Sequence, residues 1–193
     1  MTITYCVGSG LYINITNRCS NDCVFCIRNY SDSVGNAGSL WLSHEPGRDE
    51  ILDDIMKRDL TGFDEIVFCG FGEPTYRLDD MLWLCREIKK FCMLPIRVNT
   101  NGHADLIAGY DTSPLFSGCV DRISISLNAP DAGEYSELCK PVFGIDAYRG
   151  VIDFANNIKD YVPEVILSVM GGLTDVERCR LVADEMGLPL RVR

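Results

Sequence analysis

The sequence predicts an α/β protein with a parallel sheet, because short apolar segments alternate along the chain with segments of helical periodicity. Strand and helix follow one another at intervals of roughly 30 residues, which is typical of right-handed βαβ units. The chain has 193 residues, whereas a closed eight-stranded barrel needs about 250. Two architectures therefore fit the length, an open partial barrel or a doubly wound sheet. No linker or repeat divides the chain, so we expect one domain over residues 1–193.

Six segments are predicted as strands because they are short and mostly apolar, as expected when both faces of a sheet are covered. They are residues 11–15, 65–69, 96–99, 122–127, 165–169 and 190–192. Four segments carry apolar residues at spacings of three and four, which predicts helices with one buried face. They are residues 49–56, 78–92, 151–158 and 175–186, and Gly187 and Pro189 end the last of them. Residues 30–46 are predicted as a long loop.

Composition excludes several classes of protein. There are 28 acidic and 18 basic residues, giving a net charge of −10, which argues against nucleic acid or anionic membranes as direct partners. No apolar run approaches the roughly 18 residues of a spanning helix, and the first residues do not resemble a signal peptide. We therefore expect a cytoplasmic protein. Its ten cysteines are too few for a disulfide-rich scaffold, so clustered cysteines indicate metal or redox chemistry.

Three cysteines follow the first predicted strand directly. Cys19, Cys23 and Cys26 have the spacing C-x3-C-x2-C, which can bring three thiolates to one metal centre. A structural zinc site usually needs four ligands, and neither a second C-x2-C pair nor a close histidine pair is present. An iron–sulfur cluster with three cysteine ligands instead leaves one iron open to another molecule. A zinc site with a distant fourth ligand remains the alternative.

This cysteine motif, with Phe25 directly before its last cysteine, resembles the cluster loop of the radical S-adenosylmethionine (radical SAM) superfamily. The resemblance implies a partial (βα)6 TIM-like barrel of parallel strands, open on one side. It also implies a [4Fe–4S] cluster on Cys19, Cys23 and Cys26, with S-adenosylmethionine on the open iron and Phe25 beside it. Together with the segments GFGEPT and SLNAP, the chain looks most like the small TatD-associated radical SAM proteins, and it also resembles the activating-enzyme branch.

The segment after the second strand resembles the family motif that holds the amino group of S-adenosylmethionine. The matching residues are Gly70, Gly72 and Glu73. Glycines in a turn expose backbone polar groups at close range, and an ammonium group needs acceptors of this kind. The alternative is an ordinary Gly-Pro turn between a strand and a helix.

Polar residues at the ends of the later strands complete the predicted cofactor site. Asn99, before Thr-Asn-Gly, matches a position near the amino group, where it would offer an amide acceptor; the alternative is a plain Asn-Gly turn. Ser126 and Asn128 share a face of an alternating strand and match positions near the ribose and the carboxylate. Their alternative is a polar strand face exposed to water. Ser168 would lie near the adenine.

The resemblance implies an enzyme in which a reduced cluster cleaves S-adenosylmethionine to a 5′-deoxyadenosyl radical that abstracts hydrogen from a substrate. Flavodoxin or ferredoxin would supply the electron. The enzyme would be an oxidoreductase or resemble an activating enzyme, and its substrate would be a partner protein that receives a glycyl radical or a small molecule. A functional link to a TatD-type hydrolase is also expected. The alternative is a non-catalytic iron–sulfur or zinc module, a sensor or scaffold, which would not need the strand-end segments.

Two further expectations concern residues outside these motifs. Arg18 and Arg28 flank the cysteine loop and would form a basic patch for the electron donor. The seven remaining cysteines show no second cluster spacing and are expected mainly to pack in the core, with Cys69 on its strand near the site. Cys119 and Cys139 are placed in loops, where an auxiliary cluster is an alternative.

Overall fold

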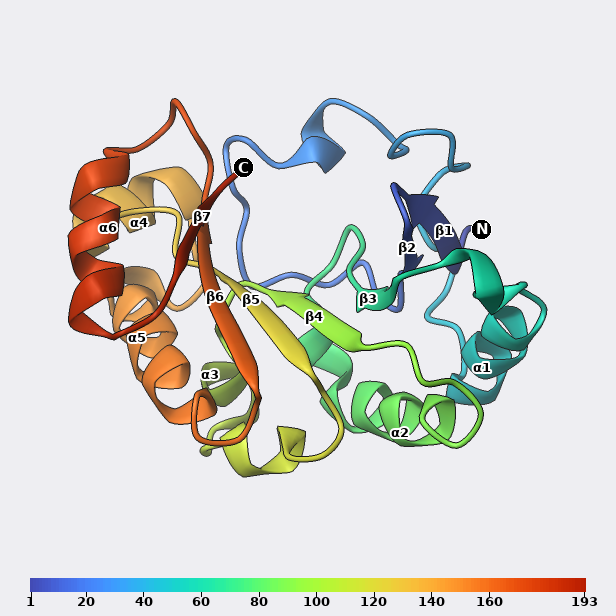
Figure 1. Ribbon diagram of the computed structural model, residues 1–193. Coiled ribbons are helices and arrows are strands. Elements are labelled where there is room, and N and C mark those ends of the chain that lie inside the picture. Colours follow the sequence, from blue (N-terminus) through green and yellow to red (C-terminus); the bar gives the residue numbers. More distant parts are fainter.

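The computed structural model describes residues 1–193 and contains one seven-stranded sheet in the order β1 to β7 (Figure 1). Strands β2 to β7 are parallel, and β1 pairs with β2 in the antiparallel sense. The strands are β1 (Thr4–Val7), β2 (Gly10–Ile13), β3 (Glu65–Phe68), β4 (Ile96–Thr100), β5 (Arg122–Ser126), β6 (Glu164–Val169) and β7 (Leu190–Val192). The six predicted strands correspond to β2–β7, each within two residues of its predicted bounds.

Strand β1 is an addition that the sequence analysis did not predict. It forms a hairpin with β2 in which Val7 pairs with Gly10, so that only Gly8 and Ser9 make the turn. Gly8 has φ +56°, the left-handed conformation that tight two-residue hairpin turns require. The sheet therefore has one antiparallel edge strand beside its six parallel strands.

Six α-helices cover one face of the sheet. They are α1 (Arg48–Met56), α2 (Leu78–Ile88), α3 (Ala104–Ala108), α4 (Ala132–Cys139), α5 (Ala147–Ile158) and α6 (Val176–Glu185). A single core of 40 buried residues contains side chains from all six helices and from alternate residues of the strands. Because every helix packs on this same face, the doubly wound alternative is wrong. Helices α3 and α4 were not predicted.

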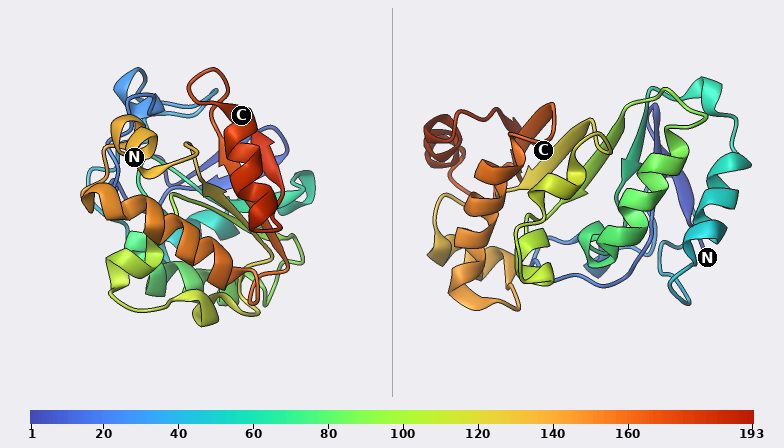
Figure 2. Two further views of the ribbon diagram at one scale, coloured as in Figure 1. Left: turned by 90° about the vertical axis from the view of Figure 1, so that its left-hand side faces the viewer. Right: turned by 90° about the horizontal axis from the view of Figure 1, so that it is seen from below.

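The sheet curves around its other, concave face and is open between β1 and β7 (Figures 1 and 2). Along β5, Ile123 and Ile125 point into the core, so Arg122, Ser124 and Ser126 face the concave side. None of the helices combines the length and apolar character that a membrane-spanning helix requires. The polar concave face and the carboxyl ends of its strands are thus the parts of the sheet that helices leave free.

Candidate functional site

The three clustered cysteines lie on the loop that follows β2, at the carboxyl edge of the sheet. Cys19, Cys23 and Cys26 are free thiols, and all three line one cavity of about 260 Å³. The backbone N–H of Asp22, in the same loop, donates to the carbonyl of Cys139 at 3.0 Å. This bond ties the cysteine loop to the end of α4, so a distant part of the chain supports it.

The thiols do not converge on a single metal ion, since no three His, Cys, Asp or Glu side chains are close enough to share one. A tetrahedral zinc ion needs its sulfur ligands at about 2.3 Å from one centre, whereas a cubane cluster distributes its thiolates over separate irons. Three thiols on one loop are therefore compatible with a cluster.

The Gly-rich segment after β3 packs directly against the start of the cysteine loop. The backbone N–H of Glu73 donates to the carbonyl of Arg18 at 2.7 Å. A Cβ atom on Gly72 would overlap the carbonyl of Thr16 and lie 2.6 Å from that of Arg18, and one on Gly70 would overlap the side chain of Asn14. Both glycines are therefore required by close packing, whether or not they also bind a cofactor.

Gly72→Ala is expected to disturb the cysteine loop selectively. The added methyl group meets two backbone carbonyls that cannot turn away, so we expect a loss of roughly 1–3 kcal/mol in the free energy of unfolding and a lower iron content after reconstitution. Gly47→Ala is the matched control, because Gly47 has φ −62° and no atom near the position of the new Cβ. Urea unfolding and iron analysis of both variants check this; equal behaviour of the two would contradict it.

Glu73 is the buried acid of the site. Its side chain lines the cavity, and the residue is only 3% exposed. One carboxylate oxygen accepts hydrogen bonds from the N–H (3.1 Å) and hydroxyl (2.8 Å) of Thr75 and from the hydroxyl of Thr100 (2.7 Å). The other accepts from the N–H of Asn101 at 2.6 Å. Glu73 therefore joins the carboxyl ends of β3 and β4 beside the cysteines.

No basic side chain pairs with Glu73. Burial raises the pKa of its carboxyl group, although the donors from Asn101, Thr100 and Thr75 act in the opposite direction. A buried carboxylate with neutral donors but no cation is a favourable place for a positively charged group from outside the protein.

Asn99 lines the cavity, but its amide oxygen is already engaged. Arg97 donates to that oxygen at 2.5 Å and forms a bidentate ion pair with Glu65 at 2.6 and 3.0 Å. The predicted acceptor oxygen of Asn99 is therefore already occupied by a donor of the protein itself.

The structure also brings Ser126 and Asn128 to the cavity, together with Phe25, Gly70 and Gly72. Asn128 lies beyond the end of β5 with φ +58°, and its buried amide oxygen has no hydrogen-bond partner. Ser168 faces the same side of the sheet as Ser126, with which it pairs in register. It is fully buried, donates to the carbonyl of Ile125 at 3.4 Å and does not line the cavity.

Comparison with models of protein families identifies the family of this chain. The model of the radical SAM superfamily matches residues 13–184, from the end of β2 to α6. The chain is a member of the radical SAM superfamily. Radical SAM enzymes use a [4Fe–4S] cluster and S-adenosylmethionine, so the predictions of the family, of a radical SAM enzyme and of its cofactors are confirmed. The narrower likeness to the TatD-associated group stays a prediction.

Individual proteins are also similar to the chain in sequence or in fold. A probable GTP 3′,8-cyclase of Methanocella arvoryzae is 29% identical over 186 residues, covering 94% of this chain and 54% of that protein. The crystal structure of Streptococcus suis SuiB has a TM-score of 0.66 at 17% identity and covers 95% of this chain and 39% of that one. The structure of anSMEcpe with bound AdoMet has a TM-score of 0.62 at 20% identity, with 94% and 50% covered. The predicted partial barrel fold is confirmed, and the chain spans about half the length of the curated relative.

The side chains around the cavity fit the two cofactors of the radical SAM superfamily. Three free thiols provide the ligands that an iron–sulfur cluster requires. Glu73 offers a buried carboxylate without a cation. The amide oxygens of Asn21 and Asn128 are buried acceptors without partners, and both residues line the same cavity. Acceptors of this kind suit the ammonium and hydroxyl groups of S-adenosylmethionine.

Sequence reasoning missed a buried polar network beneath the cysteine loop. The two ring nitrogens of His103 lie 2.9 Å from the hydroxyl of Ser20 and 3.0 Å from that of Tyr135. Asn101 donates to the Ser20 hydroxyl at 2.8 Å, and Asn21 donates to the Tyr135 hydroxyl at 3.0 Å. The network fixes both residues that follow Cys19. A lone histidine after an Asn-Gly turn gives no sequence signal for such a role.

Stability should depend on pH through His103. Burial lowers its pKa from 6.5 to about 4, so the folded protein keeps the ring neutral where the unfolded chain binds a proton. This contribution is fully present above about pH 6.5 and is lost as the pH falls towards 4, by about 2 kcal/mol between pH 7 and pH 5. His103→Gln should be less stable at pH 7 but should lack this part of the pH dependence. Urea unfolding of the wild type and the variant at pH 7 and pH 5 checks this prediction. An equal fall in the free energy of unfolding of both proteins would contradict it.

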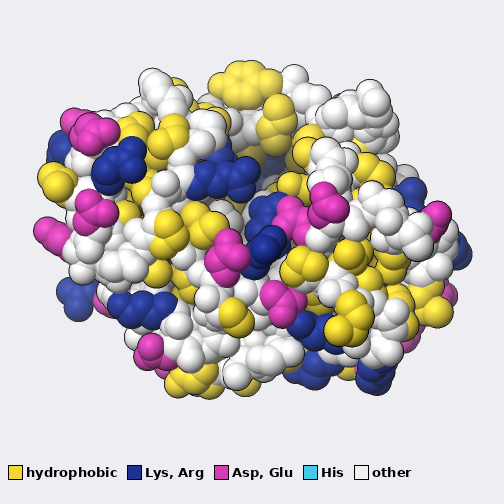
Figure 3. Space-filling view, viewed as in Figure 1, with side chains coloured by type: hydrophobic (Ala, Val, Ile, Leu, Met, Phe, Trp, Pro, Cys, Tyr) yellow, Lys and Arg dark blue, Asp and Glu magenta, His cyan; other side chains and the backbone are white.

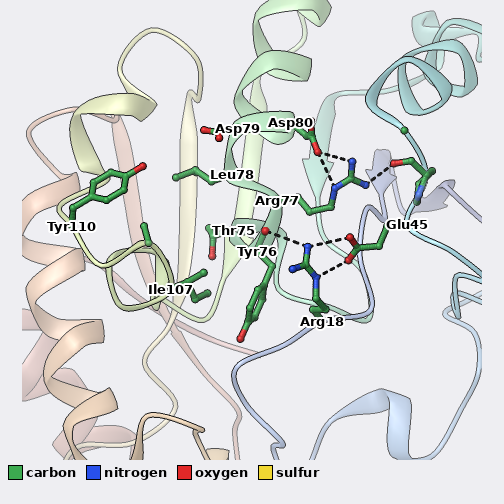
Figure 4. A pocket seen from close by; sticks show the side chains of 13 residues that line it. Arg18, Glu45, Thr75, Tyr76, Arg77, Leu78, Asp79, Asp80, Ile107 and Tyr110 are labelled. Carbon is green, nitrogen blue, oxygen red and sulfur yellow. Dashed lines mark hydrogen bonds and ion pairs between the residues drawn. The ribbon is translucent and has the colours of Figure 1, made fainter.

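Neither arginine beside the cysteine loop is a free cation. Arg18 forms an ion pair with Glu45 at 2.7 Å and donates to the carbonyl of Tyr76, on the wall of a separate cavity outside the sheet (Figure 4). Arg28 has only 15% of its side chain exposed, lies 3.6 Å from Asp22 and donates to backbone carbonyls. Both arginines thus brace the loop, and a role in docking an electron donor stays a prediction.

The remaining cysteines mostly pack, as expected, but two predictions about them are wrong. Cys6 is exposed, Cys69 is half-buried and lines the cavity, and Cys85, Cys92, Cys119, Cys139 and Cys179 are buried. Cys139 lies at the end of α4 rather than in a loop. Its thiol raises the pKa of the Cys23 thiol, and it accepts from the amide of Asn128 at 3.6 Å. It therefore belongs to the surroundings of the predicted cluster.

Proposed function

We propose that the protein reductively cleaves S-adenosylmethionine at this cavity and uses the product to abstract hydrogen from a substrate. One observation carries the proposal. Three free thiols and a buried carboxylate that forms no ion pair, from different strand ends, line the same cavity at the carboxyl edge of the sheet. In parallel α/β folds this edge is where ligands bind. The bound cofactors would supply the electron-transfer and radical chemistry.

The protein's own residues would bind and orient. Cys19, Cys23 and Cys26 would hold the cluster, and the carboxylate of Glu73 would accept hydrogen bonds from the amino group of S-adenosylmethionine. Thr100 and Asn101 hold that carboxylate in one orientation through bonds of 2.7 and 2.6 Å. The site is thus organised before the cofactor arrives, which lowers the entropic cost of binding.

We propose further that the substrate is a small molecule rather than a partner protein. This is supported by the relative of M. arvoryzae, which is named a probable GTP 3′,8-cyclase and matches over 94% of this chain. A reduced flavodoxin or ferredoxin is the proposed electron source, and a functional link to a TatD-type hydrolase remains part of the proposal.

Anaerobic reconstitution followed by electron paramagnetic resonance tests the site directly. We expect about four irons per chain and a signal of the dithionite-reduced cluster that changes when S-adenosylmethionine is added, because the open iron gains a ligand. A non-catalytic sensor with the same cysteines has no reason to respond. A reduced cluster whose signal is identical with and without S-adenosylmethionine would therefore overturn the proposed function.

A further inference from the structure

Arginines of two different kinds lie on the concave face of the sheet. Arg97 and Arg122 are matched by carboxylates: Arg97 pairs with Glu65 at 2.6 Å, and Arg122 pairs with Glu164 at 2.8 Å. These pairs bridge neighbouring strands, so their charges are neutralised within the sheet. Their role is accounted for without any ligand.

Arg191 and Arg193, in and after β7, have no carboxylate partner. Arg193 is held in place by its backbone, because its N–H donates to the carbonyl of Val169 at 2.9 Å. Its guanidinium donates to the hydroxyl of Ser126 at 3.3 Å, and it lines the same cavity as the three clustered cysteines. Arg191 lines a second cavity of about 300 Å³, further along the concave face, whose wall also carries Asp64, Glu65 and Glu164.

The two guanidinium groups act on one another. Burial lowers the pKa of Arg193; the thiols of Cys69 and Cys23 act to raise it, and the charge of Arg191 acts to lower it. Arg191 also acts on the carboxylate of Glu65, but neither arginine forms an ion pair, and two neighbouring cations repel one another. Basic side chains are visible within the hollow at the centre of this face (Figure 3). Such a pair is suited to an anion that comes from outside.

We propose that Arg193, assisted by Arg191, binds a carboxylate or phosphate group of the substrate on the concave face, next to the cofactor cavity. The inference rests on the proposed function, in which the substrate must reach that cavity. Guanidinium groups suit both anions because they donate parallel hydrogen bonds. The carboxylate of S-adenosylmethionine has the same chemistry. Arg191 lines the second cavity, away from the cysteines, which favours the substrate.

Equilibrium dialysis of radiolabelled sulfate against the anaerobically reconstituted holoenzyme, with and without saturating S-adenosylmethionine, tests this proposal. We expect one sulfate per chain, bound equally well in the presence of S-adenosylmethionine. Arg193→Gln should weaken sulfate binding about tenfold and Arg191→Gln by a smaller factor, since each removes charge-assisted hydrogen bonds. Arg149→Gln is the matched control, because Arg149 lies on α5 and pairs with Asp153 at 3.0 Å. It should bind sulfate as the wild type does.

Three outcomes would overturn the proposal: no sulfate bound by the wild type, equal weakening in the Arg149 and Arg193 variants, or displacement of sulfate by S-adenosylmethionine. The last would assign the arginines to the cofactor's own carboxylate. Sulfate binding does not depend on turnover. Failure of the proposed function is therefore recognised separately: the holoenzyme would bind sulfate but would leave S-adenosylmethionine intact in the presence of dithionite.

Discussion

Replacing Cys26 with alanine is expected to abolish the iron–sulfur cluster while leaving the fold intact. Cys26 lines the cavity and lies on a loop outside the main core, so its loss removes a ligand and little packing. Cys26 is a sharper test than Cys23, because Cys139 is near enough to Cys23 to raise its pKa and offers a replacement ligand. Iron analysis after anaerobic reconstitution should fall from about four per chain to near zero.

Cys85→Ala is the matched control for this loss. Cys85 is fully buried on α2, within the core on the opposite side of the sheet from the cavity. Its replacement should lower the free energy of unfolding on the order of 1 kcal/mol and leave the iron content unchanged. Full iron loading of the Cys26 variant would show that the ligands have been assigned incorrectly.

Glu73→Gln is expected to weaken the binding of S-adenosylmethionine roughly 10- to 100-fold, because a charge-assisted hydrogen bond to an ammonium group is worth about 1.5–3 kcal/mol. The substitution keeps the size of the side chain and removes the only buried acidic side chain in the cavity. It also replaces one carboxylate oxygen with an NH2 group, which cannot accept hydrogen bonds. Either the bond from Asn101 or those from Thr75 and Thr100 are lost, so the free energy of unfolding should fall modestly.

Binding and stability can be separated for this variant. Glu87→Gln serves as the control, since Glu87 lies on α2 and pairs with Lys90 at 2.6 Å, away from the cavity. Calorimetric titration of S-adenosylmethionine into both reconstituted variants, with iron content and thermal unfolding measured on the same samples, checks the expectation. Unchanged affinity in a fully loaded Glu73 variant would remove Glu73 from the cofactor site.

Local sequence patterns were enough to predict most of the fold. The strands of the parallel sheet are short apolar runs, and α2 and α5 repeat apolar residues at helical spacing. These strands and helices could therefore be located in the sequence. Helix α4 could not, because only Tyr135 and Cys139 on it are buried, which is too little periodicity to detect. Strand β1 was not predicted because it lies at the edge of the sheet with only half of its four residues buried.

The candidate site likewise contains residues that the sequence could predict and residues that it could not. Cys19 and Glu73 could be predicted because each belongs to a contiguous motif next to a strand end. The bond from Asn101 to Glu73 and the contacts of His103 could not, since they join segments that meet only after the sheet has formed. Arg193 gives no signal in the sequence either, because its lack of a partner is a property of the folded concave face.

The formation of 5′-deoxyadenosine and methionine tests the central claim most directly. The reconstituted protein is incubated anaerobically with S-adenosylmethionine and dithionite, and both products are quantified by mass spectrometry beside the Cys26→Ala variant. We expect the wild type to release the two products in equal amounts and the variant to release neither. A wild-type protein that carries about four irons per chain yet forms neither product would contradict the account.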